Sequence, residues 1–337
     1  MLRDSPRIPA RLVVAAAACL ALSGCYYVHL AAGQLEMNRK REPIEDVIAR
    51  PETDATLKRR LELAARARDF AMSSLGLPDN GSYRTFADLG RRYATWNLFA
   101  APEFSVVPKN WCFPVAGCVS YRGYFDERGA TRAAERLRDR GLDVYVGPSI
   151  AYSTLGHLRD PVLNTMLGYG DAELAAFIFH ELAHQAVYAP GDSDFNEAFA
   201  TVVETEGLRR WFEQEARPAE LEKFLALRKK QQAAAGLMVA TRARLATLYK
   251  SGLAEQPMRD AKSAEFARLG NELSSGGFST SGDFNNARLI AVATYERCVP
   301  ALRAELDRVS NDLPAFYSAM NLLVNNPVAR KQLCPAP

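Results

Sequence analysis

Hydrophobic residues recur at helical spacing through the first part of the chain that follows residue 24. The repeat is broken once, by Arg68, and its apolar members are Leu57, Leu61, Ala64, Ala65 and Met72. This spacing places apolar side chains along one face of a helix. Proline disfavours helix interiors, so Pro43 and Pro51 mark helix boundaries. Residues 25–90 are therefore predicted to form a helical cover.

The pattern changes in the middle of the chain to short runs of β-branched and aromatic residues separated by Gly and Pro. These runs are Tyr93–Asn97, Phe104–Val107, Val119–Phe125, Val144–Gly147 and Ala151–Thr154. Such runs are typical of strands. Between two of them, residues 130–140 have the composition of a helix that Gly141 ends. The order of strands and helices predicts a mixed sheet.

Helical patterning returns after Gly207 and continues to the end of the chain. An apolar stripe starts after Pro218, includes Leu221 and Tyr249, and stops at Gly252, which predicts one unusually long helix. Residues 285–306 and 313–323 predict two more helices. The Ser- and Gly-rich segment 274–282 predicts a loop, which either covers a functional site or is an ordinary surface loop. The expected fold class is α+β, mainly helical, with a C-terminal helical bundle over residues 208–337.

The N-terminus has the composition of a secretion signal. Basic residues precede an apolar run over residues 12–22, and Leu22-Ser-Gly-Cys25 follows as a lipobox. The run is too short to span a bilayer, which takes about twenty residues. Residues 1–24 are therefore expected to be a lipoprotein signal peptide, with Cys25 carrying lipid. Because Tyr26 rather than Asp follows the cysteine, we expect the periplasmic face of the outer membrane.

The mature chain is expected to form one domain, residues 25–337, with its sheet and the helices that carry its candidate chemistry in 91–207. Four of its cysteines suit an oxidising compartment, where pairs form disulfides. We predict the pairs Cys112 with Cys118 and Cys298 with Cys334. A zinc site of four thiolates is the alternative, and their irregular spacing disfavours it.

Charge indicates no particular partner. The formal net charge of +3 includes three arginines and one aspartate of the signal peptide, so the mature chain is close to neutral. This balance gives no indication of nucleic-acid binding or of a polybasic membrane patch.

The residues that carry chemistry lie in Phe177-Ile-Phe-His180-Glu181-Leu-Ala-His184-Gln185. Residues four apart share one face of a helix, so His180 and His184 can turn ring nitrogens toward the same ion. Glu181 lies beside them, where a carboxylate can act as general base on a metal-bound water. Two ordinary core histidines are the alternative. The chain has only four histidines, which makes a chance pair at this spacing improbable.

A catalytic zinc site needs a third protein ligand. A turn over residues 188–193 precedes a second predicted helix, which carries Glu197 and, two turns later, Glu204. We predict Glu197 as the third ligand, with Glu204 and His157 as alternatives. Glu204 could instead orient a ligand imidazole, or lie with Glu206 at a solvated helix end.

The pair HELAHQ and FNEAFA resembles the gluzincin arrangement, an HExxH helix followed by a glutamate ligand in an NExxA-type helix. A wider set of segments resembles a bacterial lipoprotein family known as putative zinc aminopeptidases. These segments are SYR (82–84), WCFPVAGCVSYRGYF (111–125), AYSTLG (151–156), DPVL (160–163) and GDSDFNEAFATVVE (191–204). The resemblance implies a zincin-like fold, a Zn²⁺ ion held by His180, His184 and Glu197, and Glu181 as catalytic base. The GAMEN-type strand that reads a substrate's free amine in better-known gluzincin aminopeptidases is missing from the sequence.

Other residues are candidates for substrate contacts. Tyr152 and Tyr188 could each donate to the oxyanion of a tetrahedral intermediate, or be core and rim aromatics. Arg122 could bind a substrate carboxylate or, as we prefer, pair with an acidic residue of the fold. Zinc peptidases hold extended substrates along an edge strand, and Ile150–Thr154 is the candidate for that strand.

Together these features predict a zinc-dependent metallopeptidase that acts on peptide substrates, at the amino terminus or within the chain. Peptidoglycan stem peptides are a second substrate class in the same compartment. The alternative function is a lipid-anchored binding or chaperone-like module whose metal site is structural or vestigial. A closed site with four protein ligands would support that alternative.

Overall fold

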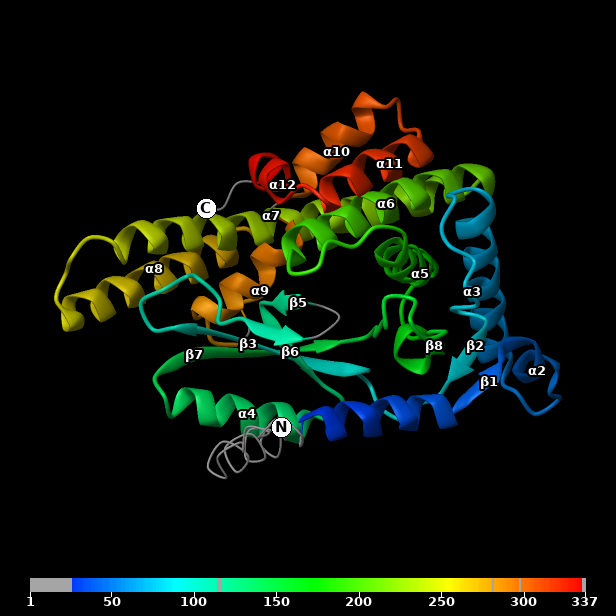
Figure 1. The fold of residues 1–337 in the computed structure, drawn as a ribbon, viewed down its shortest axis with the longest axis horizontal. Coiled ribbons are helices and arrows are strands. Elements are labelled where there is room, and N and C mark those ends of the chain that lie inside the picture. The colour runs from blue at the N-terminus through cyan, green and yellow to red at the C-terminus, as the bar shows by residue number, and fades with distance from the viewer. Residues whose placement is uncertain (1–25, 114–116, 281, 297, 335–337) are drawn as a thin grey trace, which may run out of the picture.

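The computed structural model describes residues 26–113, 117–280, 282–296 and 298–334. The predicted signal peptide and Cys25 lie outside the described residues, so their roles stay predictions. Helices predominate over small sheets, which confirms the expected class, α+β and mainly helical. Figure 1 shows the helices α5 (Asp171–Ala186), α6 (Ser193–Gln214) and α7 (Pro218–Leu248) above a central sheet, with α4 (Glu127–Arg138) below it.

The central sheet has strand order β6-β3-β7, where β3 is Thr95–Pro102, β6 is Tyr121–Tyr124 and β7 is Leu142–Ser149. β3 pairs antiparallel with both neighbours. Helix α4, Glu127–Arg138, connects β6 to β7. These two strands run parallel to each other, and β3 fills the space between them in the opposite direction. The prediction of a mixed sheet is therefore wrong for these three strands, because both pairs in the central sheet are antiparallel. The β6–α4–β7 crossover leaves a gap between its two parallel strands, and β3 occupies that gap.

Two smaller sheets flank the central one. β1 (Arg41–Pro43), β2 (Thr85–Ala87) and β8 (Val162–Leu163) form a sheet that is mixed, since β2 pairs antiparallel with β1 and parallel with β8. β4 (Trp111–Phe113) and β5 (Gly117–Val119) form a hairpin. The predicted disulfide between Cys112 and Cys118 joins the two strands of this hairpin.

Two predicted strands are wrong. The segment Ile150–Thr154 is irregular, because β7 ends at Ser149, opposite Thr95, the first residue of its partner β3. No strand remains there for further pairing. The segment Phe104–Val107 is irregular as well, since β3 ends at Pro102. Val106 packs instead against the hairpin of α7 and α8, and its carbonyl accepts hydrogen bonds from Arg242.

The N-terminal helices form as the apolar spacing predicts. They cover residues 26–39, α2 (Ile44–Ala49) and α3 (Ala55–Ser73). Asp54 caps α3 by accepting hydrogen bonds from two backbone N–H groups of its first turn. Arg68, which interrupts the apolar stripe, is buried beside an ion-pair partner, Asp79, and donates to the carbonyl of Ser82 at 3.0 Å. Its charge therefore joins the helix to the following loop.

Helices α5 (Asp171–Ala186) and α6 (Ser193–Gln214) pack against each other at the centre of the molecule. Asp192 caps α6 by accepting from the backbone N–H of Phe195 at 3.2 Å. The turn between the helices is closed by Asn196, whose side chain exchanges hydrogen bonds with the backbone of Ala189 in both directions. This local structure reverses the chain, as the turn composition predicts.

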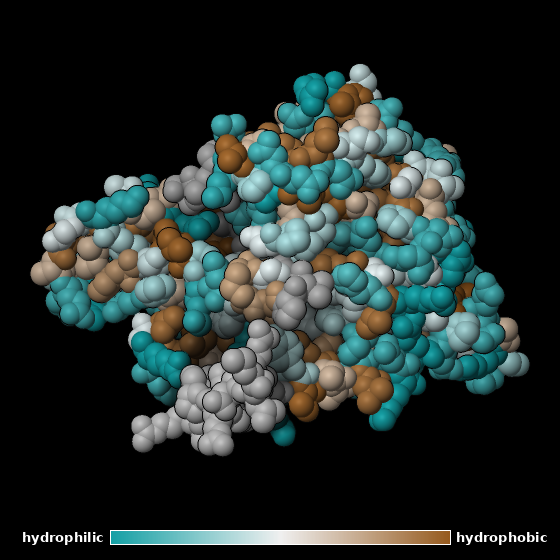
Figure 2. All heavy atoms as spheres, viewed as in Figure 1, coloured by the Kyte–Doolittle hydropathy of each residue, from teal (hydrophilic) through white to brown (hydrophobic). Residues whose placement is uncertain are grey.

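The C-terminal part is helical, as expected. Its helices are α7 (Pro218–Leu248), α8 (Glu255–Ser275), α9 (Asn286–Glu296), α10 (Val299–Arg308), α11 (Leu313–Val324) and α12 (Pro327–Leu333). The helix expected over residues 285–306 is divided into α9 and α10 near Cys298, which forms the predicted disulfide with Cys334. The hairpin of α7 and α8 projects from the rest of the molecule, and hydrophilic residues dominate the face seen in Figure 2.

Helix α9 lies against β3 and β7 from one side, and α4 lies against the same strands from the other. The short helix η1, Asn164–Met166, leads from β8 toward α5. Among the helices in the described part of the chain, none has the length and apolarity that a membrane span requires.

Candidate metal centre

The centre is built on the buried helix α5. Leu174, Ile178 and Leu182 are almost fully buried and hold the helix in the core. The opposite face of the helix presents His180 and His184 to a cavity. Their ring centroids are 4.9 Å apart, with the ring planes nearly perpendicular. The spacing of four residues therefore places both imidazoles at the same cavity wall, as predicted.

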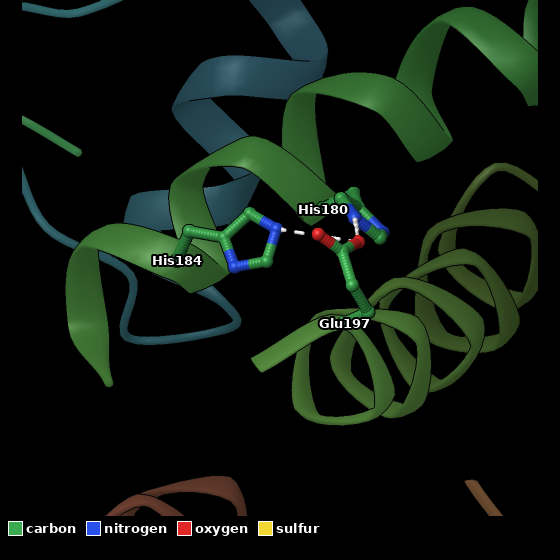
Figure 3. Close-up of side chains that lie close together, drawn as sticks. All are labelled: His180, His184 and Glu197. Carbon is green, nitrogen blue, oxygen red and sulfur yellow. Dashed lines mark hydrogen bonds and ion pairs between the residues drawn. The ribbon is translucent and has the colours of Figure 1, made fainter. Parts of the chain in front are cut away.

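Glu197 of α6 completes the group. Its Oε2 lies 3.2 Å from Nε2 of His180 and 3.8 Å from Nε2 of His184. One potential donor atom from each of the three residues lies within 4.8 Å of the others, so the group could hold a metal ion. Figure 3 shows the side chains of α5 and α6 converging on one point. The structure thus brings Glu197, rather than Glu204 or His157, to the two histidines.

The donor set and its spacing suit zinc. A tetrahedral zinc ion with Zn–N distances of about 2.0–2.1 Å holds its donor atoms about 3.3 Å apart. The separations of 3.2 Å and 3.8 Å from Glu197 are close to that value. Two imidazoles and one carboxylate are also the set found at zinc sites that keep a position for water. The donor types therefore fit this ion, and all donor atoms lie within 4.8 Å of one another.

Glu204 lies behind His180, away from Glu197. Its Oε2 is 3.0 Å from Nδ1 of His180, and its Oε1 is 3.0 Å from Nη2 of Arg228 on α7. The side chain is almost fully buried, and Glu206 is fully buried in ion pairs with Arg209 and Arg210. The alternative of a solvated helix end is therefore wrong, because α7 and α10 cover this part of α6.

Electrostatics distinguish the two histidines. Burial lowers the pKa of His180, but hydrogen bonds to Glu197 and Glu204 outweigh burial and raise its pKa to about 10. Burial lowers the pKa of His184 to about 4, with the charge of Glu197 opposing this change. Burial raises the pKa of Glu197, yet the two histidines together hold it below its ordinary value. Glu197 therefore stays ionised and attracts a cation.

Glu181 lies beside this group and faces the same cavity. Burial, opposed by His180 and reinforced by the charges of Glu197 and Asp160, raises its pKa to about 7. A carboxyl group with a pKa near the working pH can both accept and donate a proton. This is the property that a general acid and base requires.

The cavity has a volume of about 1120 Å³ and lies between the central sheet and helices α5 and α6. β3, β6 and the segment after β7 supply one wall, and α5, α6 and α7 supply the other. His157 lines the cavity without joining the metal group. The described residues of the loop 274–282 do not line it, so they do not cover the site. The volume is slightly above the range of about 300–1,000 Å³ that is typical of small-molecule sites.

Tyrosines distribute unequally around the metal group. Burial and the charge of Glu197 raise the pKa of Tyr188. Burial raises the pKa of Tyr121 further, with contributions from Glu197, Tyr188 and Glu181. Tyr152 packs against Phe125 with ring centroids 4.9 Å apart, and burial together with Asp160 raises its pKa to about 12. Among the described tyrosines, Tyr121 and Tyr188 are thus the two whose pKa is raised by the charge of Glu197.

Asp160 organises the segment that replaces the predicted edge strand. Its carboxylate accepts hydrogen bonds from the backbone N–H of Thr154 at 3.0 Å, from the Thr154 hydroxyl at 2.8 Å and from the Ser153 hydroxyl at 3.2 Å. Its carbonyl accepts from the N–H of Tyr83 at 2.6 Å. The segment SYR therefore meets AYSTLG and DPVL, which lie far from it in sequence, and AYSTLG carries this contact to the cavity wall.

Tyr121 and Asp160 lie in segments that carry the family resemblance, but the sequence assigned no role to either side chain. Tyr121 follows β5 in an aromatic run where a catalytic hydroxyl cannot be told from a core ring. Asp160 precedes a proline in a short polar stretch that is typical of turns. Arg122 has no acidic partner among the described residues, and its guanidinium carbon lies 3.6 Å from the centroid of the Tyr26 ring. Its contact with a substrate carboxylate stays a prediction. Stacking on an aromatic ring replaces the expected acidic partner.

Comparison with known proteins identifies the family of the chain. Residues 25–333 match the family described as "Putative aminopeptidase". Because the match covers almost the whole chain, the protein belongs to this family. No curated protein matches the chain, and no solved structure matches it.

Proposed function

We propose that the protein is a zinc-dependent peptidase of the gluzincin type, with a zincin-like arrangement of the metal helices. The observation that carries the proposal is the convergence of His180, His184 and Glu197 within 4.8 Å beside the free carboxyl group of Glu181. Family membership supports a peptidase over a binding module. Three donors in an open cavity also suit a catalytic site, since structural sites have four protein ligands.

Each residue of the group has a distinct part in the proposed reaction. A bound Zn²⁺ supplies Lewis acidity and lowers the pKa of water. Glu181 accepts the proton of the attacking water and donates it to the leaving amine, which its pKa near 7 allows. Glu204 holds the Nδ1 of His180, so that Nε2 stays directed at the ion. Tyr121 and Tyr188 are the candidate donors to the oxyanion.

The proposed substrate is a peptide, and the anchor expected at Cys25 would hold the enzyme at the periplasmic face of a membrane. Apolar and aromatic side chains dominate the cavity lining, including Phe113, Phe177 and Phe224. These surfaces suit apolar substrate side chains. Peptidoglycan stem peptides and ordinary peptides are the two proposed substrate classes.

The decisive experiment combines metal analysis with digestion of a peptide library by the purified protein and by the variant Glu181→Gln. We expect about one zinc ion per chain in both proteins, and a loss of turnover of about 10²- to 10⁴-fold in the variant. The variant Glu213→Gln, an exposed glutamate of α6, is the matched control and should behave as wild type. Equal hydrolysis by Glu181→Gln would exclude the assigned base.

The same library with acetylated amino termini separates the two modes of cleavage. An aminopeptidase loses activity on the acetylated peptides, because it must bind the free amine, whereas an endopeptidase cleaves both sets. Absence of cleavage in either set, with zinc at full occupancy, would favour a binding module over an enzyme.

A further inference from the structure

A second cavity lies next to the one that holds the metal group. Its volume is about 480 Å³, and Tyr26 and Tyr124 line both cavities. Basic side chains dominate its lining. We call it the basic pocket and define its cations as Lys109, Arg122, Arg132, Arg136 and Arg140. Asp126 is the acidic residue among the lining residues.

The five cations come from separate parts of the chain. Lys109 precedes β4, Arg122 lies on β6, and the three others belong to α4 or follow it directly. Arg132 and Arg136 are four residues apart and share one face of the helix. Basic residues near the C-terminal end of a helix are often explained by their favourable interaction with the helix dipole alone. That explanation does not apply to Arg122 and Lys109, which lie outside the helix.

The positive charge of the pocket is only partly compensated. Among the described residues, none of the five cations forms an ion pair with a carboxylate. Asp126 is already engaged, because it accepts from the N–H of Gly129 at 2.6 Å and lies 3.5 Å from Nδ1 of His29. In a chain with 42 basic and 39 acidic residues, this local excess does not follow from composition. Like charges gathered in a concave site attract an anion.

Arg122 indicates the kind of anion. Its guanidinium lies over the Tyr26 ring, with 3.6 Å between the guanidinium carbon and the ring centroid. The Nε atom is buried and has no hydrogen-bond partner among the described residues. A stacked guanidinium still offers its N–H groups in plane, where a phosphate accepts two of them at once. The pocket therefore suits a phosphate group.

The position of the pocket indicates where that phosphate comes from. Tyr26 directly follows Cys25, the expected site of lipid attachment, and it packs with α4 and β6 in one apolar cluster. The helix over residues 26–39 exposes Tyr27, Val28 and Leu35. In Figure 1 this helix and α4 both lie below the central sheet. Cations and exposed apolar side chains thus occur together on the part of the molecule that lies next to the expected lipid anchor.

We propose that the basic pocket binds the phosphate of an anionic lipid headgroup and so sets the orientation of the protein on the bilayer. This inference goes beyond the proposed peptidase function and does not depend on it. The tether at Cys25 limits the distance to the membrane, while the pocket would fix which face meets it. Because Tyr26 and Tyr124 line both cavities, the bound headgroup would lie next to the metal cavity.

The test uses the full chain, purified in a non-ionic detergent, and three soluble probes: dihexanoyl phosphatidylglycerol, dihexanoyl phosphatidylcholine and inorganic phosphate. Binding is measured by calorimetry and by the fluorescence of Trp111, which lines the pocket. The variant Arg132→Gln/Arg136→Gln removes two exposed cations from the pocket. The matched control, Arg128→Gln/Arg138→Gln, removes the same charge from α4 outside the pocket.

Phosphatidylglycerol should bind to wild type more tightly than either other probe, and less tightly as salt rises. Each cation near an anionic headgroup contributes about fivefold in affinity, so the pocket variant should bind roughly 25-fold more weakly. The control should stay close to wild type. Equal affinity for phosphatidylcholine, or an unchanged pocket variant, overturns the proposal. Inorganic phosphate binding as tightly as phosphatidylglycerol also overturns it, in favour of a free-anion site.

Hydrolysis of a soluble peptide separates this proposal from the proposed function. The pocket variant should cleave it at the wild-type rate, because Arg132 and Arg136 do not line the metal cavity. A matching loss of hydrolysis and of lipid binding in this variant would mean that the substitutions damage the fold, and Arg122→Lys then becomes the deciding variant. That substitution keeps the charge but loses the paired donors, so binding of phosphatidylglycerol should weaken without loss of hydrolysis. Unchanged binding by Arg122→Lys would overturn the assigned contact.

Discussion

The Nδ1 atom of His180 lies 3.0 Å from Oε2 of Glu204, on the side of the ring that faces away from Glu197. The other oxygen of Glu204 pairs with Arg228 at 3.0 Å, so α7 helps to hold the carboxylate in place. A carboxylate on the far nitrogen of a ligand imidazole selects its tautomer and fixes the orientation of the ring. Glu204 is therefore placed to tune a metal ion that it does not contact.

The substitution Glu204→Gln should lower the affinity for zinc by about 10- to 100-fold, the usual cost of losing such a carboxylate partner. Competition with a chromophoric chelator measures this affinity without relying on activity. Glu213→Gln, an exposed change on the same helix, should leave the affinity unchanged. Equal affinities in all three proteins would mean that Glu204 only packs against α7.

Replacing each tyrosine of the cavity by phenylalanine should show which of them contributes to catalysis. If Tyr121 and Tyr188 donate to the oxyanion, Tyr121→Phe and Tyr188→Phe should each lower kcat by about 10²-fold, with little change in KM. Tyr152→Phe should stay close to wild type, because its charged neighbour is Asp160 rather than Glu197. Steady-state kinetics on one peptide checks all three, and a result in which Tyr152→Phe is the most damaging would reverse the assignment.

The buried carboxyl group of Asp160 predicts a dependence of stability on pH. Burial raises its pKa above the ordinary value of 3.8, although hydrogen bonds from Thr154 and Ser153 oppose the rise. The folded protein therefore binds this proton more tightly than the unfolded chain does. Asp160 contributes most to stability below its unfolded pKa, and that contribution is lost as the pH rises through the folded pKa.

Urea unfolding of wild type and Asp160→Asn across this pH window tests the sign. The free energy of unfolding of wild type, minus that of the variant, should fall as the pH rises. Because Asparagine cannot replace every acceptor contact of the carboxylate, a constant loss of about 1–3 kcal/mol should accompany the change. A difference that grows with pH would show that the hydrogen bonds outweigh burial.

The two disulfides should contribute unequally to stability. Cys298 and Cys334 are 36 residues apart, whereas Cys112 and Cys118 are 6 apart. Closing the longer loop restricts the unfolded chain more, so Cys298→Ala/Cys334→Ala should lower the free energy of unfolding by about 4 kcal/mol and Cys112→Ala/Cys118→Ala by about 2 kcal/mol. Denaturant unfolding of each variant under non-reducing conditions measures the difference. The reverse order would mean that strain or residual structure dominates.

Local sequence patterns were sufficient to predict the main helices. Apolar spacing predicts α3, α5 and the long helix α7, because a helix repeats every few residues and needs no distant partner to define its face. The same local geometry places His180 and His184 on one wall. Cysteine count and compartment predicted the two disulfides, which the structure confirms.

Tertiary structure alone decided which distant groups meet. The chain offered Glu197, Glu204 and His157 as third ligand, and the packing angle of α5 on α6 brings Glu197 to the histidines while Glu204 reaches the far side of one ring. The edge strand predicted at 150–154 failed because pairing depends on where β3 begins, which lies more than fifty residues away. The cations of the basic pocket come from β6, from α4 and the residues after it, and from the loop before β4. The net charge of the whole chain does not reveal such a cluster, because it sums over all charged residues. Periodicity is a short-range property of the chain, whereas ligand sets and charged pockets depend on contacts between segments that are remote in sequence.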